Sequence, residues 1–311
     1  VGAGRDVSSI FVPRGVFYNS ITTFVSSSGA VVEDIHFIGN GRNSGFGLGA
    51  VVTETSLPQG GTFPSAVAMG LQDNSYVRRC RMTDMFQKAV AVQFSVDVWA
   101  YDCECIVTDP LLTYVQWMFQ WAECIGGGTV DCSIDSAYLT AGWEAFKSSG
   151  VHFIRPTGRN AVFSMNASHD FLIEDYDILI EAGSRFSDAF SPLTPIININ
   201  TNIVGYDVCL GGTITIATML QAGYLDASNN SLRGIVVNVD NPNVTVQGGI
   251  YTSPDWLTPG SIVGAWGLDS TGDNTNVDDF TVVGVAKPGI PNISVRDGSI
   301  TNCTANVIDG P

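Results

Sequence analysis

The sequence predicts an all-β fold: a right-handed, single-stranded parallel β-helix with inserted loops, forming one solenoid domain over residues 1–311. Three observations predict it. Short strands rich in Val and Ile recur at about one coil length, turns of Gly, Asn, Asp and Ser separate them, and no helix-length stretch shows an apolar period of 3.6 residues. Repetition at such a period is typical of solenoids.

Two neighbouring units show the repeat most clearly. The strand AVAMGL at 66–71 leads through a turn into YVRRCRM at 76–82, and AVAVQF at 89–94 leads through a turn into VWAYDCECIV at 98–107. Cys80 and Cys103 mark the same point of both units, 23 residues apart (103 − 80). Later segments at 126–135, 150–158, 161–180, 234–251 and 294–304 repeat the scheme. We therefore expect roughly ten coils.

Helices and two-residue hairpins should both be rare, because each strand of a β-helix turns a corner and pairs with the next coil. A β-sandwich is the main alternative, since it also has many short strands at regular spacing. A leucine-rich repeat is disfavoured, because Leu is sparse and no LxxLxLxxN phrase occurs.

Three stretches interrupt the repeat, at 40–65, 182–195 and 252–261. We expect them to be loop excursions from the coil wall, either places where solenoids bind ligands or places where subunits pack. Because the chain begins at Val1, we expect a fragment of a longer chain.

Composition limits the partners. Only 14% of residues are charged while 45% are hydrophobic, so other subunits should cover part of the surface, as in a closed homotrimer. The net charge of -16 leaves no basic stripe for nucleic acid. No apolar run approaches about 18 residues, so no membrane insertion is expected.

Seven cysteines form an odd set without CxxC pairs, and the chain has three His residues, so we expect no metal and no cofactor. All seven should be reduced thiols of a chain folded in a reducing cytosol. Cys80, Cys103 and Cys132 should stack inward as small hydrophobic side chains.

The coils from VVEDIHFIGNG at 31–41 through SVRDGSITNCT at 294–304 resemble the central domain of bacteriophage tailspike proteins, within the pectate-lyase-like β-helix class. The resemblance is one of architecture, without a family-specific catalytic motif. It implies a homotrimer that binds a bacterial surface polysaccharide, capsule or O-antigen, and often hydrolyses it. It also implies a virion protein of the phage tail, folded in the bacterial cytoplasm and acting extracellularly. Neither a head-binding domain nor a trimerisation module is visible, so the chain resembles the shaft alone.

Strand alternation identifies candidate site residues. If Cys103 and Cys105 fill the core, Asp102 and Glu104 point outward. The same argument, applied to Cys80, Cys132 and Phe153, predicts an outward column whose neighbours are about 4.8 Å apart. Its members are Arg79, Asp102, Asp131 and His152, and a shorter second column holds Arg81, Glu104 and Ser133.

Paired carboxylates are what glycoside hydrolysis requires, about 5 to 5.5 Å apart for retention and about 6.5 to 9.5 Å apart for inversion. We therefore predict that two of Asp102, Glu104, Asp131 and Glu144 act as acid and as nucleophile or base. The alternative is a ladder of charges that only balances itself.

Sugar binding is predicted for a second set of residues. Trp121 and Trp143 could stack on sugar rings, although most aromatic residues of this stretch should lie in the core or a trimer interface. Arg79 and His152 would bind substrate beside them.

Three function classes stay open from the sequence: a polysaccharide hydrolase, which we favour, a polysaccharide lyase with a base such as Lys147 or Arg155, and a non-catalytic β-helical shaft or receptor-binding protein.

Overall fold

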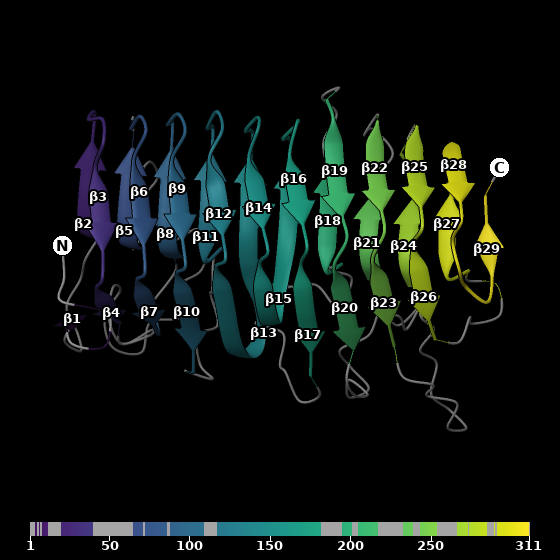
Figure 1. Cartoon of the computed structure of the whole chain (residues 1–311), viewed down its shortest axis with the longest axis horizontal. Coiled ribbons are helices and arrows are strands. Elements are labelled where there is room, and N and C mark those ends of the chain that lie inside the picture. Colours follow the sequence, from purple (N-terminus) through teal and green to yellow (C-terminus); the bar gives the residue numbers. More distant parts are fainter. Residues whose placement is uncertain are drawn as a thin grey trace, which may run out of the picture.

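The computed structural model shows the chain as one right-handed parallel β-helix, with successive coils side by side along the long axis (Figure 1). The structure describes residues 4, 6, 8–11, 20–39, 65–70, 72–85, 88–108, 117–181, 195–200, 205–216, 233–238, 243–253, 266–272, 274–284, 289 and 291–310. These residues form strands and turns without a helix, and hence no helix that could cross a membrane. The fold class predicted from the sequence is confirmed.

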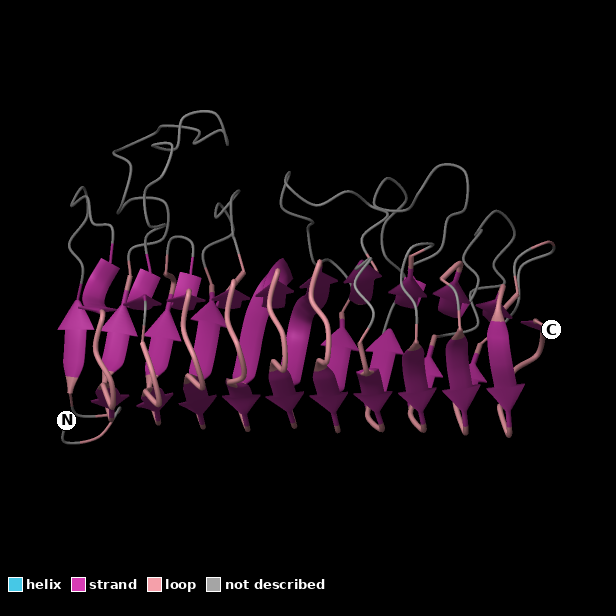
Figure 2. Ribbon diagram, turned by 90° about the horizontal axis from the view of Figure 1, so that it is seen from above, coloured by secondary structure: helices cyan, strands magenta, loops and turns pink. Residues whose placement is uncertain are grey.

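Each coil contributes one strand to each of three faces, and every strand pairing is parallel (Figures 1 and 2). The second face is a ten-stranded sheet, so the expectation of roughly ten coils is also confirmed. Its strands are β3 (Val31–Glu33), β6 (Tyr76–Arg78), β9 (Trp99–Tyr101), β12 (Gly128–Val130), β14 (His152–Ile154), β16 (Leu172–Glu174), β19 (Asp207–Leu210), β22 (Val244–Gln247), β25 (Thr275–Asp278) and β28 (Gly298–Thr301).

The first and third faces belong to one 19-stranded sheet, because β13 (Ser133–Phe146) and β15 (Thr157–Asn166) run across the corner between them. The first face comprises the C-terminal parts of β13 and β15 with β2 (Ser20–Val25), β5 (Ser65–Gly70), β8 (Lys88–Gln93), β11 (Phe119–Ala122), β18 (Ile197–Asn200), β21 (Arg233–Val237), β24 (Trp266–Ser270), β27 (Ile293–Val295) and β29 (Ile308–Asp309). The third face comprises their N-terminal parts with β1 (Ser9–Phe11), β4 (His36–Ile38), β7 (Arg81–Thr83), β10 (Glu104–Val107), β17 (Asp177–Ile180), β20 (Thr213–Ile216), β23 (Ile250–Thr252) and β26 (Thr281–Val283).

The corner between the second and third faces is only two residues wide. Its first residue adopts a left-handed conformation, with φ between 48° and 60° at Asp34, Arg79, Asp102, Asp131, Arg155 and Asp175. The second residue turns inward. Asp tolerates positive φ better than most residues, which explains why four of these six positions are Asp.

The inward position of this corner confirms one prediction and corrects another. Cys80, Cys103 and Cys132 occupy it in consecutive coils and are buried. The next coil places Pro156 there, because Thr157 pairs with Ser133. Phe153 is buried elsewhere, under the second face opposite Thr129. All seven cysteines are unpaired, and only Cys303 is partly exposed.

The longer step of 29 residues (132 − 103) between Cys103 and Cys132 does not shift the register. Glu104 pairs with Ser133, just as it pairs with Arg81 of the preceding coil. The extra residues therefore lie in the connection between β10 and β11. The predicted excursions at 40–65, 182–195 and 252–261 fall almost entirely outside the described residues.

Candidate functional site

Two of the four carboxylates predicted to be catalytic, Glu104 and Asp131, are held in ion pairs on the outer surface. Asp131 accepts two hydrogen bonds from Arg155, at 2.7 and 2.8 Å, and these bonds lower the pKa of its carboxyl. Glu104 lies 2.6 Å from Nε of Arg81. A general acid needs a raised pKa, so the environment of Asp131 opposes that role.

Arg79 belongs to the same pattern. It binds Asp34 of the preceding coil through two hydrogen bonds of 2.7 and 2.8 Å, and the bond lowers the pKa of Asp34. Asp102 follows Arg79 at the same corner, where the N–H of Arg79 binds the carbonyl of Tyr101. This corner therefore holds a ladder of ion pairs, Arg79 with Asp34 and Arg155 with Asp131. The catalytic role of Asp102 stays a prediction.

His152 is not a member of this column, contrary to the prediction. It pairs with Gly128 and Leu172 on the second face, and the corner position that we gave it is held by Arg155. The error came from stacking Phe153 on the cysteines. The imidazole lies edge-on to Trp99 with ring centroids 6.3 Å apart.

Trp121 and Trp143 do not form a sugar platform, because both side chains are fully buried. The indole N–H of Trp121 donates to the carbonyl of Val98 at 2.9 Å. Trp143 stacks on Phe163 with ring centroids 4.5 Å apart. Both residues therefore belong to the core, the alternative that the sequence left open.

Glu144 is separated from the other three candidates, because it points outward from β13 on the first face. The register places it opposite Gln120 of β11 and Ser164 of β15. Gln120 donates a hydrogen bond to the carboxylate of Glu144 and accepts one from the ammonium of Lys88. We call Lys88, Gln120 and Glu144 the acid–amine row.

The two charged members of the acid–amine row are buried, although they lie on the outside of the coil wall. Glu144 is 6% exposed and Lys88 is 1% exposed, while Gln120 is half-buried. Burial raises the pKa of Glu144 to about 7, against the opposing effects of Gln120 and Lys88. Burial lowers the pKa of Lys88 to about 8. Such opposite shifts bring an acid and an amine close to neutral pH, where proton transfer is most effective.

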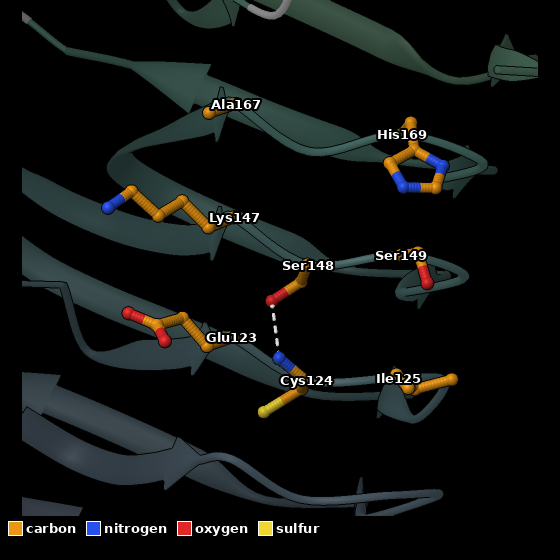
Figure 3. A pocket seen from close by; sticks show the side chains of 8 residues that line it. All are labelled: Glu123, Cys124, Ile125, Lys147, Ser148, Ser149, Ala167 and His169. Atoms are coloured by element: carbon orange, nitrogen blue, oxygen red, sulfur yellow. Dashed lines mark hydrogen bonds between the residues drawn. The ribbon is translucent and has the colours of Figure 1, made fainter. Parts of the chain in front are cut away.

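A pocket lies nearby, at the corner between the first and second faces (Figure 3). We call it the corner pocket. Its volume is about 530 Å³, within the range of small-ligand sites. It is lined by Glu123, Cys124, Ile125, Lys147, Ser148, Ser149, Ala167 and His169.

Metal ligation has no support in the described part of the chain, where no three His, Cys, Asp or Glu side chains are grouped closely enough to hold an ion. The acid–amine row instead offers proton-transfer chemistry. Sequence reasoning found Glu144 but missed Lys88 and Gln120. A single Lys opening the apolar strand KAVAVQ was the available signal, since lysines are almost never fully buried without a partner.

No protein-family model and no curated protein matches this chain. Among solved structures, it is similar to the tailspike protein of E. coli bacteriophage HK620 in complex with a pentasaccharide, at 12% identity and a TM-score of 0.50. That match covers 85% of this chain and 46% of the tailspike, so the chain spans just under half of that protein.

Two further structures are similar at lower scores. DFA-IIIase from Arthrobacter chlorophenolicus, in complex with DFA-III, has 9% identity and a TM-score of 0.47 over 90% of this chain and 69% of its own. The mannuronan C-5 epimerase A-module from Azotobacter vinelandii has 12% identity and a TM-score of 0.43 over 100% and 82%. The tailspike match places the chain in the parallel β-helix fold class, as the sequence predicted.

Proposed function

We propose that this protein binds a polysaccharide and cleaves its glycosidic bonds, with Glu144 as the proton donor. The observation that carries the proposal is the buried carboxyl of Glu144, whose pKa of about 7 keeps a large fraction protonated at neutral pH. A glycosidase protonates the leaving oxygen with such a group. The acid–amine row contains one carboxyl group, so we assign the role of proton donor to Glu144 and no second catalytic carboxylate within the row.

The ligand class draws support from the tailspike neighbour, which was solved with a pentasaccharide. The net charge of -16 favours a neutral or weakly charged polymer over an anionic one, because like charges repel. We propose a bacterial surface glycan, capsule or O-antigen, and a place in a phage tail.

Lys88 favours a second candidate, a polysaccharide lyase. A lyase removes the proton next to a uronate carboxyl, and an amine with a pKa of about 8 is partly neutral at physiological pH and can accept that proton. The acid–amine row fits either hydrolysis or the lyase reaction, but hydrolysis yields new reducing ends alone whereas the lyase reaction also yields unsaturated uronates.

The decisive experiment incubates the protein with purified capsular and O-antigen polysaccharides and follows new reducing ends and the absorbance of unsaturated uronates. Reducing ends without unsaturation support hydrolysis, and unsaturation supports the lyase. The isosteric variant Glu144→Gln should lower cleavage about a hundredfold or more. Asp131→Asn, which removes an exposed carboxylate of the ion-pair ladder, should cleave like the parent. Equal activity of Glu144→Gln and parent would refute the assignment.

We also propose a homotrimer with the coils side by side. The outer surface of the second face carries a run of half-buried apolar side chains, Val130, Ile154, Leu172, Val208 and Leu210. Burying such a run between subunits would remove it from water.

A further inference from the structure

The corner pocket offers binding chemistry that the acid–amine row does not use. Its polar lip is formed by Glu123 and Lys147, which follow the ends of β11 and β13 and adopt left-handed conformations with φ of 55° and 49°. Figure 3 shows both side chains pointing back over the strand ends. Within the described residues, neither the Glu123 carboxylate nor the Lys147 ammonium has a hydrogen bond or an ion pair. The Lys147 ammonium does lie over the Phe146 ring, 5.0 Å from its centroid, a contact that leaves its N–H groups able to donate. The pocket therefore presents one hydrogen-bond acceptor and one hydrogen-bond donor to a ligand.

The opposite lip combines an apolar side chain with an oriented imidazole. Ile125 is 62% exposed, an unusual position for a large aliphatic side chain. His169 holds Asp170 through Nδ1 at 2.8 Å, and Asp170 also accepts the N–H of Tyr206 at 2.9 Å. These contacts fix the ring, so that Nε2 remains for a ligand.

The polar groups on the floor of the pocket are already paired. Ser148 is buried, and its hydroxyl accepts the N–H of Cys124 at 2.9 Å and lies 3.0 Å from the carbonyl of Phe146 (Figure 3). Because these polar groups are already satisfied, recognition falls to the two lips.

Exposed aromatic rings flank the pocket on both sides along the long axis of the β-helix. The N–H of Phe94 binds the carbonyl of Ala122, which places Phe94 one coil before Glu123, and its side chain is 55% exposed. Tyr206, beside Asp170 at the other end, is 85% exposed. Sugar rings stack on such faces through their C–H surfaces.

We propose that the corner pocket binds an N-acetylated amino sugar. The acetamido group carries an N–H for the Glu123 carboxylate and a carbonyl for the Lys147 ammonium, while the exposed Ile125 on the opposite lip would contact the apolar face of the sugar ring. One acid and one amine give the lips little net charge, which suits a neutral ligand better than a uronate. A polymer containing this sugar would continue past Phe94 and Tyr206.

This pocket is a holding site, distinct from the cleavage site. Glu144 points outward from within β13, whereas Lys147 lies beyond the end of that strand. The inference rests on the proposed function only for the ligand class, a glycan. Binding and cleavage can therefore be measured separately.

The test uses the whole 311-residue chain carrying Glu144→Gln, so that its outcome does not depend on cleavage. Saturation-transfer NMR compares the methyl glycosides of N-acetylglucosamine, N-acetylgalactosamine, glucose and glucuronic acid. At least one N-acetylated glycoside should bind about tenfold tighter than glucose or glucuronic acid, with the strongest transfer at the acetyl methyl.

Two variants localise the site. Lys147→Met and Glu123→Gln should each weaken binding of the acetamido sugar about tenfold, the effect of losing one charge-assisted hydrogen bond. Arg296→Met removes an exposed cation near the C-terminal end of the β-helix, far from the corner pocket, and should leave binding within about twofold of the parent. Equal binding of all four glycosides, no binding of any, or binding unchanged by both pocket variants would overturn the proposal. Loss of cleavage in Glu144→Gln tests the proposed function alone.

Discussion

Glu144 and Asp131 both point out of the coil, yet their surroundings move their pKa values in opposite directions. Asp131 is exposed and bound by Arg155, so its pKa falls. Glu144 is buried beside an amide and a single amine, so its pKa rises. Strand alternation predicts direction, but burial decides the chemistry of the carboxyl group.

Removing the amine of the acid–amine row should shift the pH dependence of cleavage. Lys88 lowers the pKa of Glu144 through its positive charge, so Lys88→Met should raise that pKa further. A general acid works while protonated, and the alkaline limb of the kcat profile should therefore move to higher pH. Arg296→Met serves as the control for loss of a distant cation. A limb that stays in place or moves to lower pH would contradict the role of Glu144.

Asp207 should make the protein less stable as pH rises. Its side chain is fully buried, and neither carboxyl oxygen has a hydrogen-bond partner of good geometry among the described residues. Burial raises its pKa to about 7, although backbone N–H groups of Phe171 and Asp170 act against the rise. An unfolded Asp ionises near pH 3.9.

The sign of the effect follows from these two pKa values. The stability that the protonated Asp207 provides is complete below about pH 4 and is lost as pH rises towards 7. Asp207→Asn should remove this dependence and raise the free energy of unfolding at pH 8, by up to about 4 kcal/mol. Asp309→Asn, at an exposed position of the last strand, is the control. Urea unfolding at pH 5 and pH 8 measures the difference, and an equal effect at both values would contradict the assignment.

At the scale of the coil, buried serines join successive turns at the corner between the first and second faces. Backbone N–H groups of Gln72, Cys124 and Ser148 donate to the hydroxyls of Ser95, Ser148 and Ser168 in the following coils, at 2.9 to 3.1 Å. These bonds satisfy backbone groups that the corner would otherwise leave buried without a partner.

Ser148→Ala should therefore destabilise the fold by about 1 to 3 kcal/mol, because the buried N–H of Cys124 would lose its acceptor. Ser299→Ala removes an exposed hydroxyl that donates a hydrogen bond to the side chain of Asn276, so it should change stability by less than about 0.5 kcal/mol. Denaturant unfolding of both variants gives the comparison. Equal destabilisation would mean that the corner bonds add nothing.

The strands and the inward cysteines could be predicted from the sequence. Both the alternation of apolar and polar residues along a strand and the number of residues in a coil can be read from it directly. Cys80, Cys103 and Cys132 mark the same corner in three coils, and the register follows from them. The prediction for the fourth coil was wrong because Pro156, a small apolar residue, was a less visible marker of the corner than Phe153, three residues earlier in the sequence. That slip moved His152 to the wrong column.

The site could be predicted only in part, for a related reason. Alternation places Glu144, Trp121 and Trp143 on β11 and β13 but does not say which surface of a strand is covered. The two Trp side chains point inward and pack in the core, while Glu144 points outward and is nevertheless buried. Burial on the outside of a coil wall is a tertiary property that periodicity cannot reveal.

At the scale of the whole molecule, one continuous core runs through all ten coils, and each coil contacts mainly its neighbours. Stability in such solenoids is close to a sum over coils and their interfaces. The outer faces are then free to differ, and they do: the first face carries the acid–amine row, while the second carries the apolar run from Val130 to Leu210.

In the proposed trimer, a charge on the second face should separate the subunits without unfolding them. Ile154 lies outward and half-buried in that run, and Ile154→Lys would place an ammonium from each subunit in the contact. Burying an unpaired charge costs several kcal/mol, so the dissociation constant of the trimer should rise about a hundredfold or more. Val283→Lys is the matched control, because Val283 is an aliphatic residue on the third face and 51% exposed. Sedimentation should give a mass near three times the 33.1 kDa chain for the parent and for Val283→Lys, and a smaller mass for Ile154→Lys with an unchanged circular dichroism spectrum. A parent that sediments as a folded monomer at micromolar concentration, or an Ile154→Lys variant that remains trimeric, would show that this face does not hold the subunits together.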